Sequence, residues 1–337
     1  MAASIDSSRE WFEETGWHFD SNNDFVDKDG ELFDFESQQE HYEYVQLEIK
    51  KLIFKELEKR FQLETYPVPS RRIDKNDQKN SPYCPQVFVS RDVMSNPNLL
   101  VIVQGLGEVP PGQWARKLFT NGKRGQFDLA TQFPYIQRAL HARWAVVLCD
   151  PNRDENRPRT QMTRSHHVRR VWEDIVRRSK AQCVMYVAFS AGTCSTLDLY
   201  QSIGDEFTER VKAIALLDGE NGMERYEDLE DDGQWLREHS RAFSRRAMES
   251  FMAVNEQTVP TNDHDSVPGI AVDAVFEYLE KEHTRYESSL LEDDLGESKS
   301  KPAQANKDPS RSPTTKPYVP SQNHGSVELM KKFLQQR

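Results

Sequence analysis

Residues 183–200 read CVMYVAFSAGTCSTLDLY. The first seven are apolar and predict a buried strand, and the small and polar residues after them are typical of a helix start. Ser190 lies at the junction, in the sequence Ala188-Phe189-Ser190-Ala191-Gly192. This is the layout of a nucleophile elbow, in which a tight turn from strand to helix presents a serine at the edge of a sheet. Ala188 stands where the first glycine of the GxSxG pattern is usual.

Four short apolar runs alternate with helix-length segments along the middle of the chain. Nearly continuous apolar strands separated by helices indicate a parallel sheet that is buried on both faces. The sequence therefore predicts an α/β-hydrolase-like three-layer sandwich with a mostly parallel central sheet. The expected strands are 99–103, 144–149, 183–188 and 213–217, and the expected helices are 131–141, 167–180, 192–203 and 270–283.

The N-terminal part is expected to form a hairpin followed by a helix. Asp29-Gly30 is the expected turn of the hairpin, and Ser37 and Glu40 form a capping box at the start of the helix. The C-terminal part is rich in Ser, Lys, Pro and Asn, and it cannot bury enough apolar surface to offset the entropy of ordering. We expect four parts: a hairpin and helix extension packing on the core, 1–80; an α/β-hydrolase-like domain, 81–290; a disordered tail, 291–324; and a short C-terminal helix, 325–337.

The composition narrows the class of protein. No apolar run approaches the roughly 20 residues that span a bilayer, and residues 1–14 lack the basic and apolar regions of a secretory signal. We therefore expect no membrane segment. The cysteines form no CxxC pair, which favours a reducing compartment, either the nucleus or the cytoplasm. They are Cys84, Cys149, Cys183 and Cys194.

Charge is unevenly distributed along the chain, whose net charge is −11. Residues 1–66 contain 17 acidic and 7 basic residues, so they carry nearly all of the net negative charge. Between Arg153 and Lys180 there are nine basic and four acidic residues. This basic segment has two interpretations, a weak contact with RNA or the solvated outer face of a helix. It lacks interleaved aromatic residues for base stacking.

Further residues complete a candidate hydrolytic site around Ser190. The strand at 99–103 leads into Gln104-Gly105-Leu106-Gly107, where this fold places one backbone amide of the oxyanion hole, and Ala191 would supply the other. Asp218 follows the strand at 213–217, and His264 precedes the last helix. The order Ser190, Asp218, His264 is that of an α/β-hydrolase triad. Glu249 is the alternative acid, while Asp218 as a turn residue and His264 as a loop histidine are the alternatives without catalysis.

Three patterns that suggest metals or cofactors are weak. Residues 25–36 resemble a calcium-binding loop, but Phe25 stands at the first ligand position and no helix is expected before it. The glycine loop does not continue as GxGxxG, because Pro110 occupies the third site. His166 and His167 are adjacent, so their side chains diverge. We expect no metal site and no cofactor.

The chain also resembles a known family over roughly residues 10–285. The residues that carry the resemblance are LLVIVQGLGEVPPGQWARKL at 99–118, WAVVLCDPN at 144–152, VMYVAFSAGT at 184–193 and AIALLDG at 213–219. They resemble the Argonaute-binding-protein-two domain of animal cotranscriptional regulators and of a fission-yeast RNA-silencing subunit. Its most specific part here is the run from Gly105 to Arg116.

The resemblance implies an α/β-hydrolase-like scaffold that associates with an Argonaute protein and with chromatin or splicing factors in RNA silencing or cotranscriptional splicing regulation. It places Ser190 at the family's elbow serine and His264 at its late histidine. Phe189 and Gln104 stand where the family has histidines. An active serine hydrolase of the esterase or thioesterase type is the alternative function.

Overall fold

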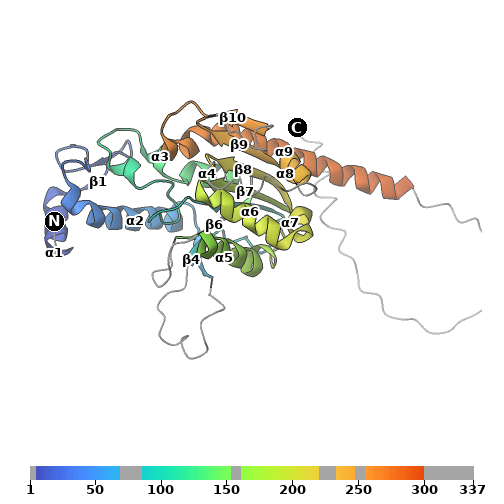
Figure 1. Cartoon of the computed structure of the whole chain (residues 1–337). Coiled ribbons are helices and arrows are strands. Elements are labelled where there is room, and N and C mark those ends of the chain that lie inside the picture. The colour runs from blue at the N-terminus through green and yellow to red at the C-terminus, as the bar shows by residue number, and fades with distance from the viewer. Residues whose placement is uncertain (1–4, 69–85, 153–160, 220–232, 247–254, 300–337) are drawn as a thin grey trace, which may run out of the picture. The chain divides into compact units, whose positions relative to one another are not determined.

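The central feature of the molecule is an eight-stranded sheet with the order β10-β9-β8-β7-β5-β6-β4-β3 (Figure 1). The computed structural model describes residues 5–68, 86–152, 161–219, 233–246 and 255–299. All neighbouring strands between β10 and β6 in this order pair in parallel. β4 pairs antiparallel with both of its neighbours, β6 and β3. The strands are β3 (Glu64–Pro67), β4 (Gln86–Val89), β5 (Asn98–Val103), β6 (Ala145–Leu148), β7 (Cys183–Phe189), β8 (Val211–Leu217), β9 (Ser240–Ser244) and β10 (Glu256–Thr258).

Helices cover both faces of this sheet. One face packs against α2, α4 and α9, and the other packs against α5, α6, α7 and α8. Alternate residues of one strand point to opposite faces, so Leu100 and Ile102 join the first core while Leu99 and Val101 join the second. The described α-helices are α1 (Ile5–Thr15), α2 (Tyr42–Lys59), α3 (Phe127–Ala130), α4 (Phe133–His141), α5 (Gln161–Val171), α6 (Ala191–Ile203), α7 (Asp205–Arg210), α8 (Gly233–His239) and α9 (Val267–Lys299).

The predicted fold class is confirmed. β7, which leads to Ser190, lies in the middle of the sheet, and the crossed order β4-β6-β5-β7 with an antiparallel β4 is that of an α/β-hydrolase. All four predicted strands are present as β5, β6, β7 and β8. The expected helix at 167–180 begins earlier, as α5, and continues through a π-helical turn at Trp172–Val176.

The N-terminal hairpin forms, but its turn is not where the sequence predicted it. β1 (His18–Phe19) pairs with β2 (Phe25–Val26), so the connecting turn precedes Asp29-Gly30. The residues directly before 25–36 form β1 and a turn, because α1 already ends at Thr15. Asp29 and Gly30 form a second turn, in which the carboxylate of Asp27 accepts hydrogen bonds from the backbone amides of residues 29 and 31.

The capping box at Ser37 and Glu40 is not formed. The Ser37 hydroxyl instead donates to the backbone and side-chain oxygens of Asp34. A 3₁₀ turn occupies Gln39–His41, and α2 begins only at Tyr42. The helix itself is as predicted, since its buried residues Val45, Ile49, Ile53 and Leu57 recur at helical spacing.

The last helix is longer than the predicted 270–283. α9 begins at Val267 and continues to Lys299, while the compact unit that contains the core ends at Leu291. Residues 300–324 of the predicted tail and the predicted helix at 325–337 lie outside the described residues.

The described cysteines are all buried. Cys149, Cys183 and Cys194 are buried free thiols in or beside the sheet. Burial raises the pKa of Cys183 to about 12, which keeps this thiol protonated at neutral pH. They act as small apolar side chains. Cys84 lies outside the described residues. In the described part of the chain, no helix combines the length and apolar character needed to cross a membrane.

Gly269 sets the contact between α9 and α3. A Cβ atom at this position would lie 2.3 Å from the Cα of Leu129, which is backbone and cannot move aside.

We expect Gly269→Ala to lower the free energy of unfolding by about 1–3 kcal/mol through overpacking. Chemical denaturation measures the change. Glu277→Ala, an exposed change in the same helix, should stay within about 0.5 kcal/mol of the wild type; equal stability of the two variants would contradict this packing.

Candidate active site

Ser190 occupies a strained turn between β7 and α6. Its backbone angles are φ 52° and ψ −123°, a conformation that side chains other than glycine rarely adopt. Neighbouring backbone crowds this turn, because a Cβ on Gly192 would lie 2.4 Å from the carbonyl oxygen of Val103. A Cβ on Gly105 would lie 3.2 Å from the Cβ of Ser190. The small residues predicted for an elbow are therefore required here by close contact between backbone segments.

Asp218 and His264 are hydrogen-bonded to each other. The distance from Nδ1 of His264 to Oδ2 of Asp218 is 2.5 Å, although 46 residues separate them in the sequence. Asp218 lies at the carboxyl end of β8, next to the strand that ends at Ser190, and its side chain is only 1% exposed. This is the acid–histidine pair that the sequence predicted.

Arg245 is a second partner of Asp218. Its Nε lies 2.7 Å from Oδ2 of Asp218, and its backbone amide donates to Oδ1. Burial by itself would raise the pKa of Asp218, but hydrogen bonds from His264 and Arg245 outweigh burial and hold the pKa below its ordinary value. Asp218 is therefore a carboxylate at neutral pH. Sequence reasoning did not identify Arg245, although its position directly after β9 was the available signal.

His264 lies over the elbow as well as beside the acid. Its ring stacks on Phe189, the residue before Ser190, with ring centroids 4.7 Å apart. Because Nδ1 faces Asp218, Nε2 is the nitrogen left to act as a base. Among the described residues the Ser190 hydroxyl makes no hydrogen bond, so the hydrogen bond between Ser190 and His264 is not formed. Such contacts are often long in a site without substrate.

Buried side chains hold the glycine loop opposite the elbow. Nη2 of Arg164 donates to the carbonyl oxygen of Gln104 at 2.7 Å, and Nδ2 of Asn152 donates to the carbonyl oxygen of Gly105 at 2.9 Å. A second nitrogen of Arg164 binds the side chain of Asn152. The Gln104 carbonyl and the Gly105 amide belong to one planar peptide group. By fixing that carbonyl, Arg164 fixes the direction of the predicted oxyanion amide of Gly105.

A lysine anchors the turn that carries His264. Nζ of Lys117 lies 2.8 Å from Asp265 and 3.2 Å from Asp263, the two residues on either side of the histidine. Ser266 also donates to Asp263 at 2.6 Å. These contacts restrict the short 3₁₀ turn His264–Ser266. Lys117 and Arg164 were both missed by sequence reasoning, because each acts across more than fifty residues of chain.

The other candidates that the structure describes are not brought into the site. Glu249, the alternative acid, lies outside the described residues. In the described segments, no group of three or more His, Cys, Asp or Glu side chains could hold a metal ion. Nε2 of His167 accepts the backbone amide of Asp150, and burial lowers the pKa of this histidine to about 3, so it is neutral and structural.

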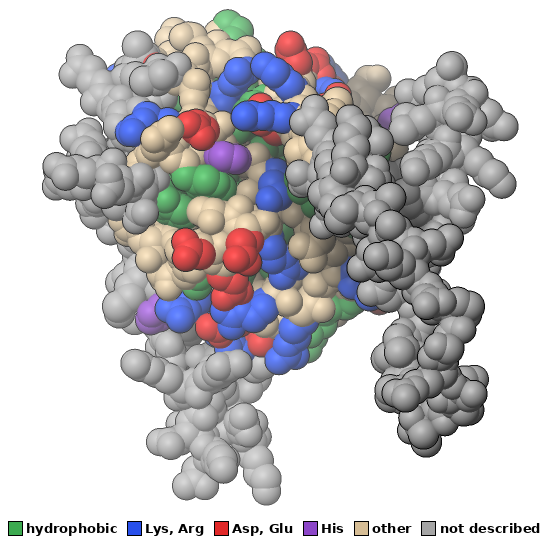
Figure 2. Space-filling model, turned by 90° about the vertical axis from the view of Figure 1, so that its right-hand side faces the viewer, with side chains coloured by type: hydrophobic (Ala, Val, Ile, Leu, Met, Phe, Trp, Pro, Cys, Tyr) green, Lys and Arg blue, Asp and Glu red, His purple; other side chains and the backbone are tan. Residues whose placement is uncertain are grey.

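The basic segment presents little unpaired charge in its described part. Arg164 is buried, and four further arginines form ion pairs with Glu173, Asp174 or Glu206. The four are Arg169, Arg170, Arg177 and Arg178. Figure 2 shows basic and acidic side chains interspersed on the face that it views, rather than a continuous basic field. These pairs favour the solvated-face interpretation over RNA binding.

Comparison with known proteins relates part of the chain to a domain family. The model of the Arb2 domain matches residues 153–249, which include the elbow and Asp218. This segment is therefore similar to the Arb2 domain. A FAM172 family protein homolog from Caenorhabditis elegans is 28% identical over 223 residues, which are 59% of this chain and 65% of that protein. The human cotranscriptional regulator ARB2A is 24% identical over 257 residues, 60% of each chain. The chain thus spans about three fifths of the length of the curated relatives it matches.

Two solved structures share the fold of this chain. A histone deacetylase structure from Saccharomyces cerevisiae aligns with a TM-score of 0.51 at 12% identity, over 72% of this chain and 98% of that one. The histone deacetylase Clr3 aligns with a TM-score of 0.50 at 16% identity, over 71% of this chain and 39% of that one. At these identities the similarity is one of fold alone.

The lowered pKa of Asp218 leads to a pH-dependent difference in stability. The carboxylate stabilises the folded protein above its unfolded pKa, about 3.9, and this stabilisation is lost as the pH falls through the lower folded pKa. We expect Asp218→Asn to lower the free energy of unfolding by about 1–3 kcal/mol near pH 7, and the deficit to shrink below about pH 4.

Urea denaturation of both proteins between pH 7 and pH 3 measures this difference. Asp273→Asn is the control, since the side chain of Asp273 is 98% exposed. A deficit that stays constant over the whole pH range would contradict the role given to the Asp218 charge.

Proposed function

We propose that this protein is a serine hydrolase that cleaves an ester, thioester or similar acyl bond. The observation that carries the proposal is the strained turn at Ser190 beside the hydrogen-bonded pair Asp218 and His264. A strained serine between a central strand and a helix serves nucleophilic attack better than it serves stability, because an ordinary N-cap needs no positive φ.

The residues have distinct roles in the proposed reaction. Oγ of Ser190 attacks the acyl carbon while Nε2 of His264 accepts its proton, and the amides of Ala191 and Gly105 donate to the developing oxyanion. The C–O or C–S bond then breaks, and His264 returns the proton to the leaving group. Water attacks the acyl-enzyme in the second half, with His264 again as base. Asp218 orients the imidazole and stabilises its protonated form.

Arg245 positions the acid of the proposed triad. Its Nε donates to Oδ2 of Asp218 at 2.7 Å, and its backbone amide donates to Oδ1. These contacts fix the carboxylate beside His264.

Covalent labelling tests the hydrolase. We expect a fluorophosphonate probe to label the wild type and not Ser190→Ala, and hydrolysis of short-chain p-nitrophenyl esters to fall about 10⁴-fold in the variant. Ser202→Ala is the matched control, since Ser202 lies later in the same helix, α6, and its hydroxyl bonds a backbone carbonyl. A folded wild type that reacts no faster than Ser190→Ala would refute the proposal.

A second function is supported by the relatives rather than by the geometry. Human ARB2A is named a cotranscriptional regulator, and the family resemblance implies association with an Argonaute protein and with chromatin or splicing factors. We propose that this protein also acts as such a scaffold, in the nucleus, the cytoplasm or both. The acidic region 1–66 is the surface proposed for docking.

A binding assay with a purified Argonaute protein of the same organism tests the scaffold. We expect a complex at about 10 μM protein, with Ser190→Ala binding as the wild type does. The double variant Glu10→Lys and Glu14→Lys, which reverses two exposed charges on α1, should bind the Argonaute protein about tenfold or more weakly. Asp128→Lys with Glu277→Lys reverses the same number of exposed charges elsewhere and should have little effect. Absence of a complex, or equal loss in both double variants, would contradict docking through this region.

A further inference from the structure

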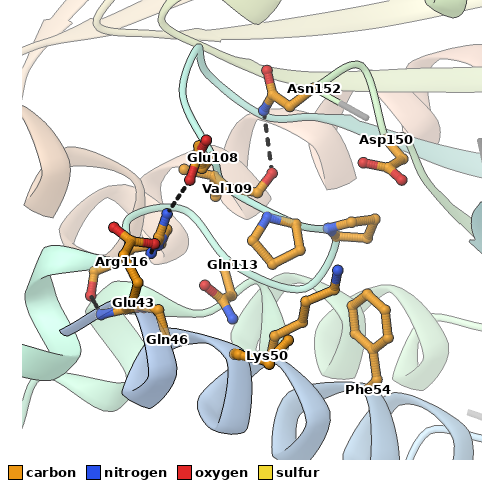
Figure 3. A pocket seen from close by; sticks show the side chains of 13 residues that line it. Glu43, Gln46, Lys50, Phe54, Glu108, Val109, Gln113, Arg116, Asp150 and Asn152 are labelled. Carbon is orange, nitrogen blue, oxygen red and sulfur yellow. Dashed lines mark hydrogen bonds and ion pairs between the residues drawn. The ribbon is translucent and has the colours of Figure 1, made fainter. Parts of the chain in front are cut away.

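A pocket of about 370 Å³ lies between α2 and the loop that follows β5 (Figure 3). Its walls come from Gln46, Lys50 and Phe54 on α2, from residues 108–113, and from Asp150 and Asn152 after β6. The volume is in the range of small-molecule sites. The hydrolytic mechanism above does not use this pocket.

Unpaired glutamine atoms lie at the floor of the pocket. Gln113 is fully buried, and neither Oε1 nor Nε2 of its amide has a hydrogen-bond partner among the described residues. Oε1 of Gln46, a residue that is 4% exposed, likewise lacks one within the described chain. Buried polar side chains are normally paired, so three unpaired atoms lining one pocket indicate a missing partner.

The position of Gln113 is fixed by its backbone. Its carbonyl oxygen accepts a hydrogen bond from the side chain of Gln132, and its amide donates to the carbonyl oxygen of Pro110. In Figure 3 the Gln113 side chain lies between the loop and Lys50, whose long side chain extends across the pocket beside it. Gln113 and Lys50 both line the cavity.

The walls favour a flat ligand without net negative charge, because three carboxylates, on Glu43, Glu108 and Asp150, line the pocket together with two basic side chains, Lys50 and Arg116. Phe54, Pro110 and Pro111 contribute ring faces. Glu43 and Glu108 hold Arg116 between them at 2.8 and 2.9 Å, and Asp150 adds a further carboxylate. Carboxylates accept hydrogen bonds from hydroxyl groups and repel phosphates.

We propose that this pocket binds adenosine, with the adenine edge against the amide of Gln113. A glutamine amide pairs with adenine through two parallel hydrogen bonds, donating from Nε2 to a ring nitrogen and accepting from the 6-amino group at Oε1. The ring faces stack on the base, and the carboxylates at the rim accept from the ribose hydroxyls. The proposal is independent of Ser190.

Calorimetric titration of the full chain with adenosine tests the site. We expect binding that weakens about tenfold or more in Gln113→Leu, the loss of a bidentate pair. The wild type should bind purine riboside, which lacks the 6-amino group, about tenfold more weakly than adenosine. It should also bind adenosine monophosphate more weakly than adenosine. Gln137→Leu, an exposed change on α4, should bind as the wild type does.

Thermal melting distinguishes the proposed site from a purely structural role for Gln113. Under the proposal, Gln113→Leu without adenosine should melt at a higher temperature than the wild type, because the change removes unpaired polar atoms. Adenosine should raise the melting temperature of the wild type only. Titration up to about 5 mM adenosine detects even millimolar affinity. If the wild type shows no binding over this range, water alone fills the floor of the pocket and the proposal is overturned. Equal affinity of Gln113→Leu also overturns it.

A single-stranded oligoadenylate identifies the source of the base. Tighter binding than adenosine that is lost in Gln113→Leu supports the same base site with RNA as the source, whereas tight binding that survives the change contradicts it. Fluorophosphonate labelling of Ser190 should be unchanged in Gln113→Leu, which separates this result from the outcome of the hydrolase test.

Discussion

The close approach of α6 to the end of β5 is the constraint on which the site depends. Gly192 brings helix backbone against the carbonyl oxygens of Val103 and Gln104, a distance that no side chain would allow. This approach places the elbow serine opposite the glycine loop. The carbonyl of Gln104 then meets the buried guanidinium of Arg164 on its other side. One peptide group is therefore held from two directions, and the site is assembled from backbone that cannot shift independently.

The middle of the sheet was predictable because its strands are buried on both faces. β5 to β8 appear in the sequence as unbroken apolar runs, and the elbow appears as small residues around a serine. The outer strands β3 and β10 were not predicted, since most of their residues are exposed and polar and resemble loops. The chain order of serine, acid and histidine identified the pair Asp218 and His264 despite their separation.

Contacts between distant residues were the part that the sequence did not reveal. Nothing local in the segment from Arg153 to Lys180 distinguishes Arg164 from its neighbours, yet it is buried while they pair with acids at the surface. Burial depends on which face of α5 meets the sheet, and Asn152 from another strand end supplies the partner. The capping box failed for a related reason, because Asp34 competes for the Ser37 hydroxyl.

The two edges of the sheet bear on how copies of this chain behave in solution. β3 and β10 are short, with four and three residues, and each begins with a glutamate. Pro67 ends β3 and has no amide hydrogen to offer a neighbouring strand, and Glu64 is tied to Arg91 across the strand pair. Short, charged and proline-ended edges resist pairing with a second sheet. A chain with many buried β-branched residues is in this way protected from aggregating edge to edge while its central strands keep their continuous apolar character.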